Sequence, residues 1–296
     1  MKLQVAAPDF SLAHTLECGQ AFRWQARPGG GYYGFLGACA VKATQDQALL
    51  TVETVDPRLT EQHIQAYFAL DVDLAPILSS IDVDAQIHEA IGRFPGLRIL
   101  RQDPWETLAS FICSSFNNIK RIEGLIERLA QAYGLPASFN GFRGCAFPRP
   151  EALAKVPERR LRELGLGFRA GYLRATARRV AEGKLSLEML KRCDYPTTKA
   201  ALMRCDGVGE KVADCVALFG LQKYDAFPID VWMERVMRYY FRKAKMTPVR
   251  MHEFAQRHFG RYAGYAQQYL YHYVRTARAP TAMRAQETTK GYAPLS

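Results

Sequence analysis

The sequence predicts a mostly helical α+β fold, in which an N-terminal antiparallel β-sheet domain precedes a helical body. Aromatic and β-branched residues lie in short runs from about residue 18 to residue 53, and turn formers such as RPGGG at 27–31 separate the runs. After Pro57 the hydrophobic residues recur at helical spacing up to about residue 278. The first pattern is typical of a small sheet and the second of a helical domain.

These patterns divide the chain into three parts. We predict a mixed β-sheet domain at 1–98, a helical domain at 99–279 and a loose C-terminal tail at 280–296, where hydrophobic periodicity is missing. The chain of 296 residues, 48% of them hydrophobic, is long enough to bury a full core. The helical pattern is clear in one segment that ends at Gly134, where five residues trace one face: Ile119, Ile122, Leu125, Ile126 and Leu129.

The balance of charges favours an anionic partner. The chain has 40 Lys and Arg against 29 Asp and Glu, which leaves a formal net charge of +11. Nucleic acid or an anionic membrane surface would both suit such a chain. No apolar run approaches the roughly 18 to 20 residues that span a bilayer, and Asp9 interrupts the first residues where a signal peptide would be apolar. We therefore expect a soluble, intracellular protein.

The cysteines indicate neither a disulfide framework nor a metal site. There are seven of them, an odd number, and none form a CxxC or Cys/His zinc spacing. We expect most to be small buried hydrophobic residues, and we expect no metal and no cofactor.

The segment 197–220 predicts a helix, a tight turn and a second helix. Gly207-Val208-Gly209 forces the turn, Lys211 begins the second helical stretch and Gly220 ends it. The glycines let backbone amides approach an anion, and the amino end of the second helix adds partial positive charge. The hairpin is therefore a natural seat for a phosphate, and such a contact does not depend on base sequence.

Lys211 and Asp230 can carry chemistry. The helix end disfavours a cation at Lys211 and so favours the neutral amine, which is a nucleophile. Such an amine can displace a base from a sugar carbon and form a Schiff base, from which β-elimination cleaves the strand. A carboxylate at Asp230 would stabilise the oxocarbenium charge that develops. Asp230 also stands where the N-cap of a helix is expected, so a purely structural role stays open.

Four separated motifs resemble one family, the 8-oxoguanine DNA glycosylases of the helix-hairpin-helix and Gly-Pro-Asp superfamily. The motifs are CGQAFRW at 18–24, LRQDPWETLASFICSSFNNIKRI at 100–122, LGLGFRAGY at 164–172 and GVGEKVADC at 207–215. The resemblance implies a bifunctional glycosylase and abasic-site lyase of base excision repair. It makes Lys211 the nucleophile and Asp230 its assistant, although the Gly-Pro-Asp element reads Phe227-Pro228-Ile229-Asp230 here.

The resemblance also implies a pocket for the extruded base. In the family, a glycine matching Gly19 offers its carbonyl to N7–H, which 8-oxoguanine has and guanine lacks. Cys215 and Tyr271 match the residues that cover the two faces of the base, and Gln267 matches the residue at its Watson–Crick edge. Without the resemblance, a buried thiol, a core aromatic ring and an exposed amide would be the simpler interpretations.

Other residues are expected to contact the DNA strands. Arg121 and Arg169 match arginines that recognise the cytosine left behind, and Phe168 matches the wedge that fills the vacated stack. One asparagine of the family is Phe116 here, so we predict a weaker preference for cytosine opposite the lesion. The full set of expected DNA contacts is Asn117, Arg121, Phe168, Arg169, Gly207, Gly209 and Trp232, the last replacing a histidine that commonly contacts phosphate.

The expected partner is double-stranded DNA that contains 8-oxoguanine opposite cytosine. We expect a monomer to bind it, in the cytoplasm or nucleoid of a prokaryote or the nucleus of a eukaryote. Three alternatives remain. Enzymes for oxidised pyrimidines or mismatched adenine often hold an iron–sulfur cluster on cysteines after the hairpin, and this chain has no cysteine after Cys215. Alkylated-base glycosylases generally lack the lysine found here as Lys211. A noncatalytic DNA-binding protein would use the hairpin only to bind phosphate.

Overall fold

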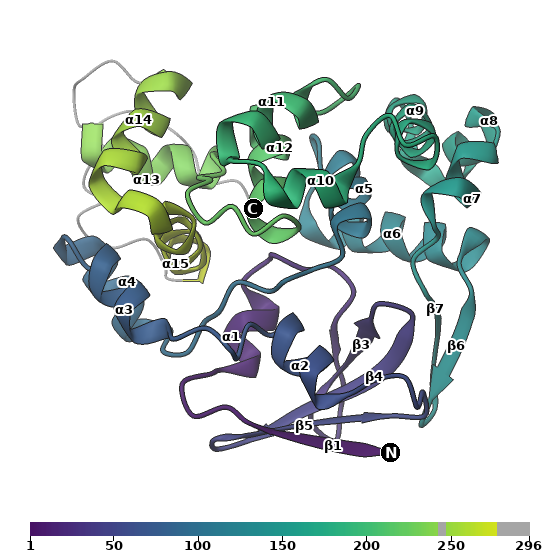
Figure 1. Ribbon diagram of the computed structural model, residues 1–296, viewed down its shortest axis with the longest axis horizontal. Helices are drawn as coiled ribbons and strands as arrows, with labels where there is room; N and C mark the ends of the chain where they lie inside the picture. Colours follow the sequence, from purple (N-terminus) through teal and green to yellow (C-terminus); the bar gives the residue numbers. More distant parts are fainter. Residues whose placement is uncertain (242–246, 277–296) are drawn as a thin grey trace.

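The computed structural model describes residues 1–241 and 247–276, so the predicted tail at 280–296 lies outside the described residues. An antiparallel sheet lies at one end of the molecule, and helices make up most of the rest (Figure 1). The predicted fold class, a sheet near the beginning followed by a helical body, is confirmed.

The main sheet has five antiparallel strands, and its two ends are formed by the first two strands of the chain. Their order is β1 (Lys2–Ala6), β5 (Leu49–Thr54), β4 (Cys39–Asp46), β3 (Tyr32–Leu36) and β2 (Gln25–Ala26). The sheet starts earlier than the predicted residue 18, because β1 pairs with β5 from Lys2↔Glu53 to Ala6↔Leu49. Pairing between distant segments requires no turn between them, and β1 therefore has no local hairpin signal.

Two helices complete the sheet domain. Helix α1 (Leu12–Glu17) precedes β2, and α2 (Glu61–Tyr67) follows β5. Apolar residues of the strands, including Val41 and Leu50, form one core with Ile64 of α2. This core is separate from that of the helical body.

A second, two-stranded sheet interrupts the part of the chain that we predicted to be helical. Strands β6 (Pro136–Phe139) and β7 (Phe142–Cys145) form a hairpin around Asn140-Gly141. Both turn residues have positive φ, 45° for Asn140 and 78° for Gly141, as the favoured two-residue turn requires. The Asn-Gly pair was a readable signal, so the prediction of uninterrupted helix was wrong here. The hairpin packs its two phenylalanines against Phe35 of the main sheet.

The helical body contains thirteen further α-helices and two short irregular turns among the described residues. They are α3 (Leu74–Ile81), α4 (Ala85–Arg93), α5 (Pro104–Cys113), α6 (Ile119–Tyr133), α7 (Pro150–Lys155), α8 (Glu158–Leu161), η1 (Arg162–Leu166), α9 (Arg169–Ala181), α10 (Leu187–Arg192), α11 (Tyr195–Met203), α12 (Glu210–Phe219), α13 (Val231–Phe241), α14 (Pro248–Phe259), η2 (Gly260–Tyr262) and α15 (Ala263–Thr276). The predicted apolar face of α6 is buried from Ile122 to Leu129, and Gly134 caps the helix as expected.

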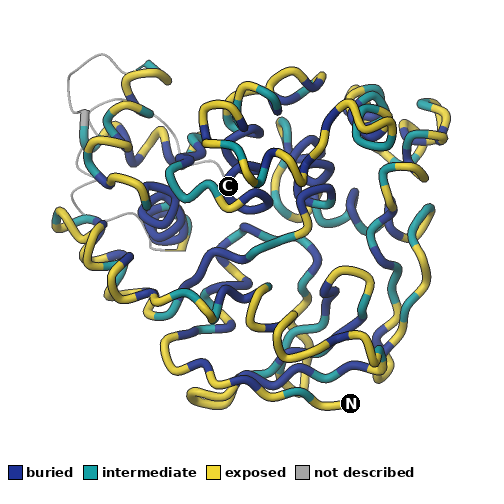
Figure 2. The backbone as a smooth tube through the Cα atoms, in the orientation of Figure 1, coloured by how far each residue is buried: buried dark blue, intermediate teal, exposed yellow. Residues whose placement is uncertain are grey.

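Helices α5, α12 and α15 form the centre of the body. Nearly every residue of α5 and α12 is buried, and α5 packs against α12. Helix α15 is buried along most of its length (Figure 2). It packs on α13 and α14 and also on α3 and α4, which come from the N-terminal part of the chain. The boundary at residue 98 stays a prediction.

Candidate active site

The predicted helix, turn and helix are present as α11, a turn at Gly207 and α12. Gly207 has φ +78°, and a Cβ there would lie 2.3 Å from Cδ2 of Tyr172. Both the backbone and the packing therefore require glycine at this position. Gly209 is the N-cap of α12 with φ −85°, and a Cβ there would meet nothing within 4 Å. The outer side of the turn is open at Gly209.

Lys211 lies in the first turn of α12 and points toward α5. Its Nζ donates to Oγ of Ser114, 3.1 Å away, and lies 5.2 Å from the centre of the Phe111 ring. Ser114 is the C-cap residue of α5 and is buried. We did not identify Ser114 or Phe111 from the sequence, although both fall within the motif at 100–122.

Asp230 caps α13, as its place in the sequence predicted. Its Oδ1 accepts hydrogen bonds from the backbone amides of Trp232, at 3.0 Å, and Met233, at 2.9 Å. The cap fixes the carboxylate at the amino end of the helix, where the helix dipole favours negative charge. A structural role for Asp230 is thus present, and it leaves a second carboxylate oxygen for other contacts.

Cys215 lies one helical turn after Lys211 and is influenced by both candidate catalytic charges. Burial raises the pKa of its thiol to about 12; Lys211 acts in the opposite direction, while Asp214 and Asp230 add to the increase. The thiol is therefore protonated at neutral pH and serves as a small apolar surface. Lys211 and Cys215 share one face of α12, and the charge of Asp230 acts on the same thiol.

Helix α15 supplies the other side of the candidate pocket. Tyr271 lies next to Gly19, since a Cβ at Gly19 would be 3.4 Å from Cε1 of the Tyr271 ring. Burial raises the pKa of Tyr271, and the negative charge of Asp230 adds to this. Gln267, one turn earlier, is 4% exposed, and its Oε1 has no hydrogen-bond partner among the described residues. The four predicted pocket residues thus come from three distant parts of the chain.

Two aromatic rings, Phe116 and Phe168, project from the protein near the turn at Gly207. Phe116 is 95% exposed and has φ 51°, an unusual backbone conformation for a bulky side chain. Phe168 is 47% exposed, and the two ring centres are 6.5 Å apart. Gly165 and Gly167, both with positive φ, form the bend that leads to Phe168. Exposed rings held in this way suit a contact with another molecule.

The three residues that we predicted to contact the opposite DNA strand lie in different surroundings. Arg169 is buried under the Phe168 ring, and its guanidinium donates to the carbonyl of Ser115, with Nε at 2.9 Å. Arg121 is exposed near the start of α6. The Asn117 amide donates to the Cys113 carbonyl at 2.9 Å and thus closes the end of α5.

Trp232 lies on the first turn of α13. Its ring is half-buried, and the guanidinium of Arg235 lies over it, 4.8 Å from the ring centre. A cation beside the ring gives this surface a positive charge at the place where the family has a phosphate-contacting histidine. Contact of Trp232 with DNA stays a prediction.

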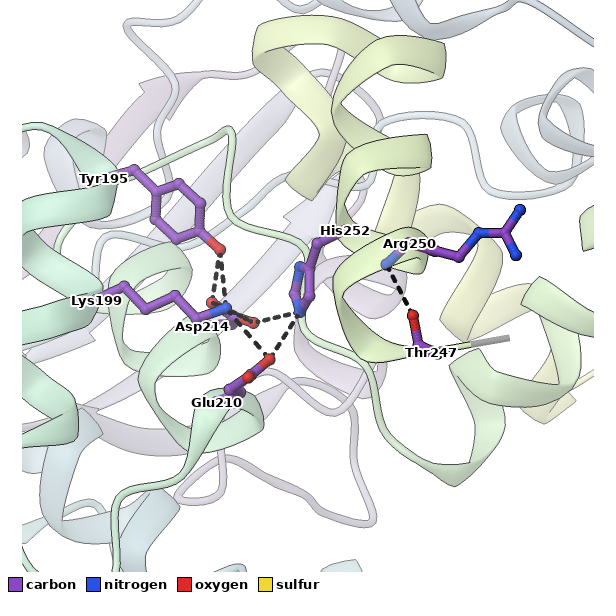
Figure 3. A network of polar contacts seen from close by, with 7 residues as sticks. All are labelled: Tyr195, Lys199, Glu210, Asp214, Thr247, Arg250 and His252. Carbon is purple, nitrogen blue, oxygen red and sulfur yellow. Dashed lines mark hydrogen bonds and ion pairs between the residues drawn. The ribbon is translucent and has the colours of Figure 1, made fainter. Parts of the chain in front are cut away.

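A polar network around the buried Asp214 joins α12 to α11 and α14 (Figure 3). Asp214 of α12 is 0% exposed; it accepts from the Tyr195 hydroxyl at 2.7 Å and pairs with Lys199 at 3.1 Å, both on α11. His252 of α14 lies 3.3 Å from the same carboxylate. Burial raises the pKa of Asp214 to about 6, although Lys199 and Tyr195 oppose this increase. Burial and the charge of Lys199 lower the pKa of His252 to about 4.

Two kinds of feature are absent from the part of the chain that the structure describes. No helix within residues 1–241 and 247–276 is both long and apolar enough to cross a membrane. In the same ranges, no three or more His, Cys, Asp or Glu side chains are grouped so that they could hold a metal ion.

The fold and the site together define a class of protein, the base excision DNA repair proteins built on a helix-hairpin-helix. The chain belongs to the HhH-GPD superfamily of these proteins, which its residues 109–259 match. Residues 2–108 match the N-terminal domain of 8-oxoguanine DNA glycosylases. The second match narrows the class to the branch that carries this domain, as the four sequence motifs indicated.

Relatives agree with this placement over most of the chain. An N-glycosylase/DNA lyase of Saccharomyces cerevisiae is 32% identical over 80% of this chain and 70% of its own length. The 8-oxoguanine glycosylase/lyase of Clostridium acetobutylicum, solved with double-stranded DNA containing cytosine opposite 8-oxoguanine, is 31% identical with a TM-score of 0.86, covering 92% of this chain and 97% of that one. The structure of MBOgg1 with a low-affinity DNA ligand is 37% identical with a TM-score of 0.88, covering 93% and 95%.

Proposed function

We propose that this protein excises 8-oxoguanine from duplex DNA with a lysine nucleophile and then cleaves the strand at the abasic site. One observation carries the proposal: the Lys211 amine, held 3.1 Å from Ser114, lies one turn of α12 before the buried Cys215, which the family resemblance places against the extruded base. The charge of Asp230 acts on the same thiol. The similarity to the Clostridium acetobutylicum glycosylase/lyase over nearly the whole chain supports the same substrate.

The chemistry starts from the Lys211 amine. The amine attacks C1′ of the deoxyribose, and the bond from C1′ to N9 breaks with its electron pair leaving on the base, which takes up a proton. Opening of the sugar ring places a proton on O4′ and leaves an imine between C1′ and Nζ. Loss of a C2′ proton then expels the 3′ phosphate, and water hydrolyses the imine. Asp230 stabilises the positive charge on the sugar during the first step.

Lesion recognition follows from the pocket. The Gly19 carbonyl accepts the N7 proton of 8-oxoguanine, while guanine would place an acceptor against it. A mispaired group of this kind costs about 1 to 3 kcal/mol. Cys215 and Tyr271 cover the faces of the base, and Gln267 pairs with its Watson–Crick edge. The buried Oε1 of Gln267, which has no partner among the described residues, supports this role.

The two DNA strands are held by the turn between α11 and α12 and by the exposed aromatic rings. The amides near Gly207 and Gly209 bind a phosphate, together with the surface at Trp232. Phe168 fills the space that the extruded base leaves. Arg121, Arg169 and Asn117 face the opposite strand. The Arg169 guanidinium, which donates to the Ser115 carbonyl, must reorient to reach a cytosine.

Reductive trapping tests the mechanism directly. Borohydride reduces an imine to a stable amine, so protein incubated with 8-oxoguanine duplex should become covalently joined to DNA. Duplexes with an oxidised pyrimidine or an alkylated purine should give no such product, because the pocket does not fit them. A product with one of these lesions and not with 8-oxoguanine would instead identify one of the other glycosylase classes.

Two lysine variants identify the nucleophile. Lys211→Gln should bind duplex DNA but neither release the base nor form the trapped product. Lys155→Gln, which changes an exposed lysine at the end of α7, is the matched control and should keep full activity. Normal base release by Lys211→Gln, or trapping at another side chain, would refute the proposal, and release by neither wild type nor variant would leave only a DNA-binding role.

A further inference from the structure

Arg275 has no role in the site described above, yet it lies against Gly19. It follows Tyr271 by one turn of α15, and its Cζ lies 5.5 Å from the Tyr271 ring centre. A Cβ added to Gly19 would come within 2.4 Å of Arg275 Nη1, whereas the nearest Tyr271 atom would be 3.4 Å away. The bare face of Gly19 is therefore covered by a guanidinium as well as by an aromatic ring.

Only part of this guanidinium is used. Nη2 donates to the backbone carbonyl of Glu17 at 2.5 Å, which holds the side chain in place. Nη1 is buried and makes no hydrogen bond of ordinary length and angle among the described residues, although the guanidinium lies close enough to the Tyr271 hydroxyl to oppose the burial that raises the pKa of Tyr271. A buried cationic N–H without an acceptor costs free energy, so such a group commonly serves a ligand.

Space for an acceptor lies beside it. A cavity of about 210 Å³ is lined by residues of the sheet domain and of the helical body, Gly19 and Arg275 among them. Its lining also includes the apolar side chains of Leu16, Trp24 and Ile119, together with Glu17. Glu123 also lines it. Burial raises the pKa of this glutamate, although Lys120 and Arg275 oppose the increase, and no hydrogen bond or ion pair joins Glu123 to Arg275 among the described side chains.

We propose that Arg275 is an additional lesion-recognition residue, whose Nη1 donates to a carbonyl oxygen next to N7 of the extruded base. The inference rests on the proposed function, in which the Gly19 carbonyl accepts the N7 proton. In 8-oxoguanine, N7–H lies between the oxygens on C6 and C8, and both are acceptors. The Arg275 N–H donor beside the Gly19 carbonyl acceptor matches this edge of 8-oxoguanine. The pair matches guanine less well because guanine has no oxygen on C8.

The test separates base recognition from the later steps. Arg275→Met keeps the length and apolar packing of the side chain but removes its donors. Excision of 8-oxoguanine under single-turnover conditions should slow about 10-fold or more. Nicking of a preformed abasic site should keep the wild-type rate, because no base is present to be recognised. Arg257→Met is the matched control: Arg257 also donates to a backbone carbonyl, that of Glu253, but does not line the cavity, and both rates should be unchanged.

A second lesion tells which oxygen is bound. In a Lys211→Gln background, which blocks the chemistry, duplex affinity is compared with and without Arg275→Met. 8-Oxoadenine keeps the oxygen on C8 and has an amine on C6. Weaker binding of both lesions assigns the contact to the C8 oxygen, and weaker binding of 8-oxoguanine alone assigns it to the C6 oxygen.

Several results would overturn the assignment. Unchanged excision would show that Nη1 has no part in recognition, and equal slowing of excision and nicking would show a structural role. Weaker binding of undamaged duplex with a shallower salt dependence would make Arg275 a phosphate contact. Should Arg275→Met fail to fold, Arg275→Leu, which also removes the donors, must show the same selective slowing. If wild-type protein releases no 8-oxoguanine in the same series, the proposed function itself fails, and this assignment fails with it.

Discussion

Substituting alanine at Gly207 tests whether the hairpin geometry is as tight as the structure shows. An L-residue at φ +78° costs roughly 1 to 2 kcal/mol. The new Cβ would also lie 2.3 Å from Tyr172 Cδ2, and overpacking of this kind costs roughly 1 to 3 kcal/mol. Tyr172 is 38% exposed, so its ring can move partly out of the way. We therefore expect Gly207→Ala to lower the free energy of unfolding by about 2 to 4 kcal/mol.

Gly209 provides a matched control two residues away. Its φ of −85° suits any residue, and a Cβ there would meet no atom within 4 Å. Alanine is a poorer N-cap but restricts the unfolded chain, so the unfolding free energy should change by less than about 1 kcal/mol. The same methyl group would stand where a phosphate approaches, and affinity for undamaged duplex should fall several-fold.

Urea unfolding at neutral pH measures the first effect, and titration of a labelled undamaged duplex measures the second. The two variants should separate, with Gly207→Ala losing mainly stability and Gly209→Ala losing mainly DNA affinity. Equal stability of the two variants would refute the packing argument at Gly207. Unchanged DNA affinity of Gly209→Ala would refute the prediction that the turn between α11 and α12 binds a phosphate.

Two further predictions concern the buried network and the exposed rings. The pKa of His252 is about 4 in the folded protein and near 6.5 when unfolded, so this residue contributes a loss of roughly 3 kcal/mol as the pH falls from 6.5 to 4. The raised pKa of Asp214 acts in the opposite direction over this range in both proteins, so the loss is measured as the difference between wild type and His252→Gln. Parallel unfolding free energies of the two proteins across that range would count against it. Phe116→Asn should raise the preference for cytosine opposite 8-oxoguanine, measured as cleavage rates against all four bases, and unchanged ratios would show that Phe116 does not read the opposite strand.

Local sequence signals determined several parts of the protein. The apolar spacing of α6, the glycine turn before α12 and the cap at Asp230 each depend on residues within a few positions, so their structure follows from short segments. The Asn140-Gly141 hairpin was equally local, and we missed it because we extended the helical pattern across it. The motifs also identified the family without any structure.

Contacts between distant segments were decided by the tertiary structure alone. Ser114 meets the Lys211 amine across 97 positions of sequence, and β1 joins the sheet by pairing with β5. Arg275 lies against Gly19 only because α15 packs beside the segment after α1. Spacing along one helix shows which residues share a face. It does not show what that face meets, because packing between elements depends on the shape of the whole core.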